Sequence, residues 1–93
     1  MELNYIKGFL KVDFDEDDEY ITLLSGVAEK YIEAATGKCD YNDPRVKLLA
    51  LVIITELYEK RSYSVEKAGE KAQYTIRSII SQLQAEEVMD DDA

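Results

Sequence analysis

The stretch from Pro44 to Ser62, PRVKLLALVIITELYEKRS, limits most strongly what this chain can fold into. Between Val46 and Thr55, only Lys47 and Thr55 are polar, so apolar residues cover more than one side of a helix. A helix that is apolar on nearly all sides is usually covered by neighbours on several sides. The run is shorter than the ~20 residues that a membrane span requires. The sequence therefore predicts a buried central helix with the other elements packed around it.

Signals at both ends place this central helix over residues 44–61. Asp43 can cap the free amides at its start, and Pro44 suits the first helical position. Lys60 and Arg61 put positive charge near the negative end of the helix dipole. The central helix is therefore expected to begin sharply at Pro44 and to end near Arg61.

Apolar residues at steps of three and four predict further helices over residues 3–11, 16–36 and 71–87. Gly37 can end the second of these, because glycine readily adopts the left-handed C-cap conformation. Residues 88–93, VMDDDA, are expected to form an acidic, disordered tail. The predicted fold is all-α: a small single-domain bundle of about four helices, with residues 1–87 as the folded domain.

The predicted core joins the central helix to the apolar stripes of its neighbours. The second helix is expected to bury one stripe, made of Tyr20, Ile21, Leu24, Val27, Ala28, Tyr31, Ile32 and Ala35. The residues expected to be buried together are Leu24, Ala28, Leu49, Ile53, Ile54, Leu57 and Ile80.

Composition argues against several functions. The chain has 93 residues, enough for one domain, with 20 acidic and 11 basic residues and a formal charge of −9. That charge is repelled by phosphate backbones, so we expect no binding to free duplex DNA. There is no histidine, which removes Ser–His pairs, Cys–His pairs and imidazole metal ligands. The single Cys39 favours a reducing compartment. We therefore expect neither enzymatic activity nor a cofactor.

The acidic segment DFDEDDE allows two interpretations. Asp13 or Asp15 can cap the second helix, and further acids in the first turn suit the helix dipole. Alternatively, Asp13, Asp15 and Asp17 match the first three ligand positions of an EF-hand calcium loop. Asp18 stands where that loop needs glycine, and Leu24 stands where it needs a bidentate glutamate. We therefore expect helix capping and no tight calcium binding.

Four apolar residues fall outside the predicted core and are candidate subunit or partner contacts. Tyr41, in the turn KCDYND, is expected to be either half-buried over the core or an exposed contact. Tyr63 and Val65, in the linker SYSVEKAG, are either buried anchors or contacts with a partner. Tyr74 lies near the start of the last helix and joins this group, although it or Ala72 is also expected in the apolar stripe of that helix, with Ile76, Ile79, Ile80 and Leu83.

Five segments follow one another in a recognisable order. They are the opening ending FLKVD at Asp13, the acidic run 15–19, the helix TLLSGVAEKYIEAATGK, the Asp43–Pro44 start of a helix that ends LYEKR, and SIISQLQ. In this order they resemble the small head–tail connector proteins of tailed bacteriophages and prophages, also described as possible DNA-packaging proteins. The family motif LYxxR matches Leu57, Tyr58 and Arg61. Lys60 and Gln84 depart from the residues common in the family, asparagine and arginine.

The resemblance implies a structural subunit without catalytic residues, metal or cofactor. It also implies a ring, commonly dodecameric, below the portal protein of the virion. Such a ring extends the DNA channel, lets DNA pass without specific binding, and supports a tail-joining or head-completion protein. The subunit would reach the virion from the host bacterial cytoplasm. Two alternatives stay open: a DNA-packaging accessory protein that does not stay in the virion, and a stand-alone helical protein-interaction module.

Tyr58 and Arg61 lie three residues apart on one face of the central helix. We expect Tyr58 to pack against the second helix. Arg61 is expected either to hold an acid or a carbonyl group, or only to complement the helix dipole.

Overall fold

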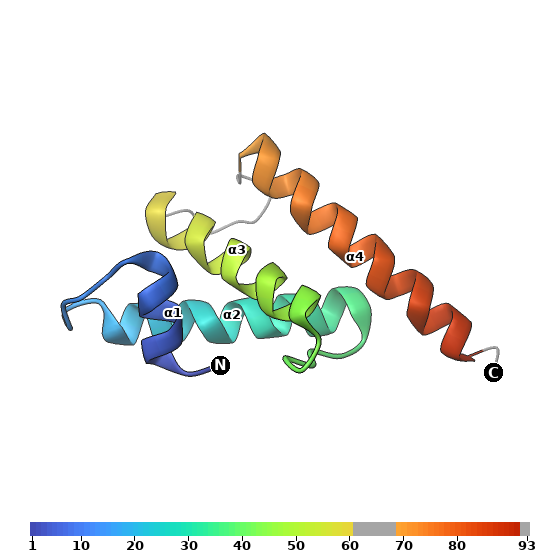
Figure 1. Cartoon of the computed structure of the whole chain (residues 1–93), viewed down its shortest axis with the longest axis horizontal. Coiled ribbons are helices and arrows are strands. Elements are labelled where there is room, and N and C mark those ends of the chain that lie inside the picture. The colour runs from blue at the N-terminus through green and yellow to red at the C-terminus, as the bar shows by residue number, and fades with distance from the viewer. Residues whose placement is uncertain (61–68, 92–93) are drawn as a thin grey trace.

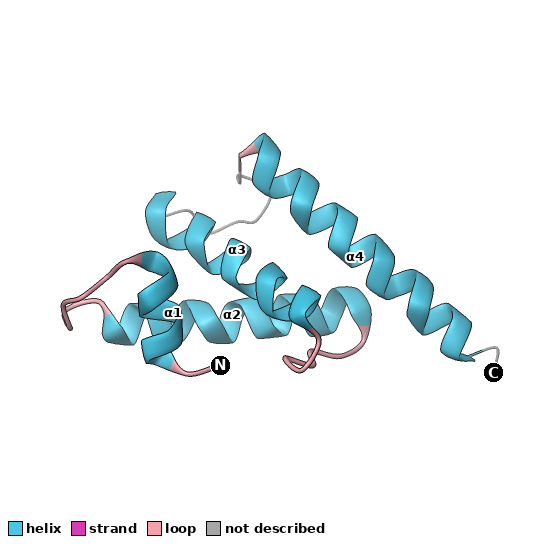
Figure 2. Cartoon of the chain, viewed as in Figure 1, coloured by secondary structure: helices cyan, strands magenta, loops and turns pink. Residues whose placement is uncertain are grey.

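The computed structural model describes residues 1–60 and 69–91, and in these ranges it contains four helices and no strand (Figures 1 and 2). The helices are α1 (Leu3–Leu10), α2 (Asp18–Thr36), α3 (Pro44–Lys60) and α4 (Glu70–Asp91). The predicted all-α bundle of about four helices is confirmed.

Helix α3 lies at the centre of the bundle and contacts each of the other three helices (Figure 1). It starts as its sequence predicts: the carboxylate of Asp43 accepts a hydrogen bond from the backbone amide of Arg45 at 2.9 Å, and Pro44 is the first helical residue. Because its apolar residues cover several sides, α3 can pack against α1, α2 and α4 together. Asp43 and Pro44 therefore set where α3 begins, and burial of its apolar residues sets where it lies in the bundle.

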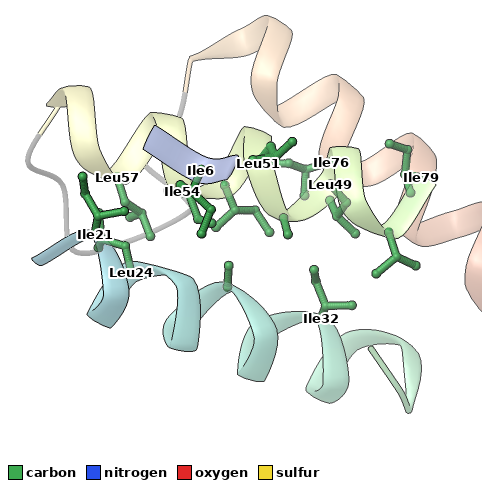
Figure 3. Packing of buried hydrophobic residues seen from close by; sticks show 14 of the residues in the cluster. Ile6, Ile21, Leu24, Ile32, Leu49, Leu51, Ile54, Leu57, Ile76 and Ile79 are labelled. Carbon is green, nitrogen blue, oxygen red and sulfur yellow. The ribbon is translucent and has the colours of Figure 1, made fainter. Parts of the chain in front are cut away.

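The core lies between α3 and the faces of the other helices that are turned towards it (Figure 3). Six of the expected core residues are buried: Leu24, Ala28, Leu49, Ile53, Ile54 and Leu57. Ile80 is only partly buried, so its placement in the deep core was wrong. Helix α4 turns Ile76 and Ile79 inwards instead, which leaves Ile80 at the edge of the core.

The buried stripe expected on α2 was too wide. Ile21, Leu24 and Ile32 point towards the core, but Val27 and Tyr31 are exposed. The reason is that the other helices cover only one side of α2. Val27 and Tyr31 lie outside that side and therefore face outwards.

The short helix α1 is held to the bundle by one apolar and one ionic anchor. Ile6 is fully buried, and the neighbouring Lys7 is buried along its stem. The ammonium group of Lys7 lies 3.0 Å from Asp15 and 2.8 Å from Asp18, both at the start of α2. Hydrogen bonds to Asp18 and Asp15 raise the pKa of Lys7 above its ordinary value. The acidic segment therefore fixes α1 against α2.

This use of the acidic segment changes the start of α2. The helix begins at Asp18, with Asp17 at the N-cap position, so the expectation of Asp13 or Asp15 as the N-cap was wrong. Asp15 pairs with Lys7 instead, and the side chain of Asp17 does not cap the helix. At the other end, Gly37 has φ 92°, and its amide donates to the Glu33 carbonyl at 2.8 Å, as expected for a glycine C-cap.

Helix α4 ends at Asp91 rather than at the expected Glu87. Residues 88–91, which we expected to begin a disordered tail, continue the helix. The last part of α4 reaches beyond the other three helices (Figure 1).

Candidate functional site

The LYEKR motif at the end of α3 contacts the beginning of α2. The ring of Tyr58 lies 6.1 Å from the ring of Tyr20, centroid to centroid, and its hydroxyl donates to Asp17 at 2.7 Å. Tyr58 therefore packs against α2, as predicted. The hydroxyl of Tyr20 donates to the carbonyl of Leu57 at 3.4 Å, while the Leu57 side chain is buried. Leu57 and Tyr58 of the motif therefore hold α3 against α2 within one subunit. Arg61 lies outside the described residues.

A polar cluster around Arg45 fixes the second half of α4 to the start of α3. The guanidinium group donates to both carboxylate oxygens of Asp43, at 3.1 and 2.7 Å, and to both carboxylate oxygens of Glu86. On the other side, Gln84 donates to the carbonyl of Ala35 at 2.8 Å. Sequence spacing could not reveal the contacts of Arg45 with Glu86 and of Gln84 with Ala35, because each joins residues more than 40 positions apart.

The Arg45 cluster is expected to make stability depend on pH. Its hydrogen bonds hold the pKa of Asp43 and the pKa of Glu86 below their ordinary values of 3.8 and 4.5. A carboxyl with a lowered folded pKa stabilises the fold above its unfolded pKa, and this contribution is lost as pH falls through the folded pKa. The melting temperature should therefore fall below about pH 4, and an Arg45→Gln variant should show a smaller fall.

Thermal unfolding followed by circular dichroism between about pH 2 and pH 7 checks this prediction. Arg77→Gln is the matched control, because within residues 1–60 and 69–91 Arg77 donates only to Gln73 on its own helix, at 3.0 Å. Equal pH profiles for the natural chain and the Arg45→Gln variant would contradict a role for the cluster.

The outer side of α2 carries an apolar face that the sequence analysis assigned in part to the core. We define it by Leu23, Gly26, Val27 and Tyr31, which lie three and four residues apart. Leu23 is 64 % exposed, Val27 45 % and Tyr31 36 %. A shallow depression runs over Leu23, Gly26 and Val27. The signal in the sequence was a second row of apolar residues, offset from the buried row of the same helix.

Gly26 is unusual within this α2 face. Glycine in the middle of a helix costs ~1 kcal/mol relative to alanine. A Cβ atom at Gly26 would meet nothing within 4 Å, so packing inside the subunit does not require glycine there. Gly26 therefore adds no side chain to the shallow depression that Leu23 and Val27 line, and we call this position the notch.

Two of the predicted contact residues can be placed and two cannot. Tyr74, in the first part of α4, is 75 % exposed, beside a second shallow depression lined by Gln73, Arg77 and other α4 side chains. Tyr41 is half-buried against the core, which is one of its two expected placements. Burial raises the pKa of Tyr41 and that of the neighbouring Cys39. Tyr63 and Val65 lie outside the described residues.

The described residues bring together no group of three or more Asp, Glu, Cys or His side chains that could hold a metal ion. Of the three carboxylates that match an EF-hand pattern, Asp15 pairs with Lys7 and Asp17 accepts a hydrogen bond from Tyr58. No described helix is both long enough and apolar enough to cross a membrane. Large apolar side chains are exposed on the α2 face and at Tyr74, and also at Tyr5, Phe9, Phe14 and Leu48.

Comparison with protein families decides the wider assignment. The family model of the phage gp6-like head-tail connector protein matches residues 1–86 of the chain. The chain belongs to this family. The match covers all four helices, including the first part of α4 up to Glu86. No curated protein and no solved structure matches the chain.

Membership of the connector family gives the chain a coarse role. Head–tail connectors are structural components of phage virions and associate with other head or tail proteins. The resemblance carried by FLKVD, the acidic run and LYEKR is thereby confirmed.

Proposed function

We propose that this connector subunit assembles with copies of itself into a closed ring below the portal protein, extends the DNA channel and supports a tail-joining protein. The observation that carries the proposal is the family match over residues 1–86. As in the sequence-based expectation, the ring is dodecameric in the particle, reaches it from the host cytoplasm and performs no catalysis.

Physical features of the subunit support this role. Apolar residues exposed on α2 and on α4 leave area that a neighbouring subunit can cover. Binding of a neighbour stabilises a small folded domain by mass action. A formal charge of −9 per subunit would let DNA slide through the ring, because an acidic lumen repels phosphate groups.

The ring is expected to form most readily at raised ionic strength. Repulsion between subunits of charge −9 opposes close approach, and salt screens such charges over ~8–10 Å. Native mass spectrometry across salt and protein concentrations, with and without the cognate portal protein, should show a closed ring as the largest species. A chain that stays monomeric or dimeric in every condition would contradict the proposed ring.

Particles provide the second test. We expect the chain in purified virions, and we expect heads assembled without it to fail to join tails. Heads that package DNA poorly, together with absence of the chain from mature virions, would favour the packaging-accessory alternative instead.

A further inference from the structure

We propose that the α2 face of one subunit receives Tyr74 on α4 of the next subunit, so that copies of this chain join head to tail. The inference rests on the proposed ring and goes beyond it, because it assigns the two surfaces that meet. The occupant of the α2 face is therefore a second copy of the same chain.

The first argument is the notch at Gly26. The position carries the cost of glycine in a helix although the subunit itself has room for a side chain there. Leu23 and Val27 beside it expose apolar surface that nothing in the described chain covers. A site with an apolar rim and a missing side chain suits an inserted aromatic ring from outside.

The second argument is the exposure of Tyr74. It is the most exposed of the large apolar side chains described, at 75 %. Tyrosine combines apolar area with a hydrogen-bonding tip and is enriched at the centre of protein interfaces.

Charge favours the same pairing. Lys71 and Arg77 lie three residues before and after Tyr74, on the same side of α4. Glu29 and Lys30 line the depression of the α2 face, and Lys30 pairs with Glu33 at 3.4 Å, so these three side chains carry a net charge of −1. Glu70 also lies beside Tyr74, so with Lys71 and Arg77 this surface carries a net charge of +1. In a chain of charge −9, contact between surfaces of net charge −1 and +1 adds no repulsion between copies.

The arrangement of the helices makes the contact head-to-tail. In Figure 1, the beginning of α4 lies on the far side of α3 from α2. One subunit therefore presents Tyr74 and the α2 face in different directions. Contacts between two different surfaces continue from copy to copy and close into a ring when the rotation permits.

Two single variants test the contact. Gly26→Gln fills the notch with a good helix former, and Tyr74→Ala removes the inserted ring. Each should weaken assembly of the full chain by ~10-fold or more in sedimentation or native mass spectrometry, while circular dichroism shows that the fold is kept. Gly26→Gln should also raise the melting temperature of the subunit, because glutamine replaces glycine in an exposed helix position.

Gly8→Gln is the matched control. Gly8 lies in α1, and a Cβ atom there would also meet nothing within 4 Å. This variant should assemble like the natural chain. Equal weakening by Gly8→Gln would overturn the assignment of the α2 face.

Mixing the two variants gives the most specific result. The Gly26→Gln chain keeps Tyr74, and the Tyr74→Ala chain keeps the α2 face, so an equimolar mixture should form heterodimers but no ring. If two α2 faces paired with each other instead, Tyr74→Ala alone would not weaken assembly. The Gly26→Gln chain would then form no heterodimer with the Tyr74→Ala chain.

The experiment separates failure of this contact from failure of the ring. If the natural chain forms a ring and both single variants do so equally well, the contact is wrong and the ring stands. If the natural chain forms no ring in any condition, with or without the portal protein, the proposed ring and this contact both fall.

Discussion

Replacing Leu49 with alanine is expected to lower the free energy of unfolding by about 2–5 kcal/mol. Leu49 is fully buried on α3, at the centre of the cluster between the helices (Figure 3). Removing its branched end takes away transfer free energy and leaves a cavity that the surrounding helices can fill only in part. Urea denaturation, with the midpoint and slope compared between variants, measures the loss.

The neighbouring residue provides the control. Leu48 is 44 % exposed on the same helix, so Leu48→Ala changes the same atoms where water already reaches them. Its cost should stay within about 1 kcal/mol. Similar losses for the two variants would mean that burial does not set the effect, and that α3 is not the core of the bundle.

The central helix could be predicted because its signals are local. Asp43 and Pro44 mark the start by hydrogen-bond chemistry and fixed backbone geometry, and both act there as expected. The continuous apolar run that follows can be satisfied only by neighbours on several sides. The order of the helices and most of the core follow from these features.

The α2 face could not be separated from the core by periodicity. A row of apolar residues at steps of three and four has the same pattern whether it meets another helix of the subunit or another molecule. Val27 and Tyr31 lie on the border between the buried and exposed rows, and only the placement of the other helices decides between them.

The ionic contacts could not be predicted from the sequence for a different reason: they depend on which helices meet in the folded subunit. Asp15 had reasonable chemistry for a helix cap, but the buried Lys7 of α1 lies within reach and pairs with it. A buried ammonium group is costly to leave unpaired, so this demand outweighs the modest gain from a cap. The contact of Arg45 with Glu86 likewise depends on where α4 crosses α3, which no local pattern records.

Replacing Ala28 with leucine is expected to destabilise the fold by about 1–3 kcal/mol. Ala28 is fully buried on the side of α2 that packs against the core. A larger side chain there must take space from neighbours that are already closely packed, or push α2 away from α3. Urea denaturation measures the change, and the far-ultraviolet circular dichroism signal should remain helical.

Ala34→Leu isolates the contribution of packing, because Ala34 is exposed on the same helix. Alanine and leucine have similar helix propensities, so this control should stay within about 0.5 kcal/mol of the natural chain. An equally small effect at Ala28 would mean that the core has room for three more carbon atoms. The α2–α3 packing would then be loose, and apolar surface covered between subunits would have to supply more of the stability of the assembled protein.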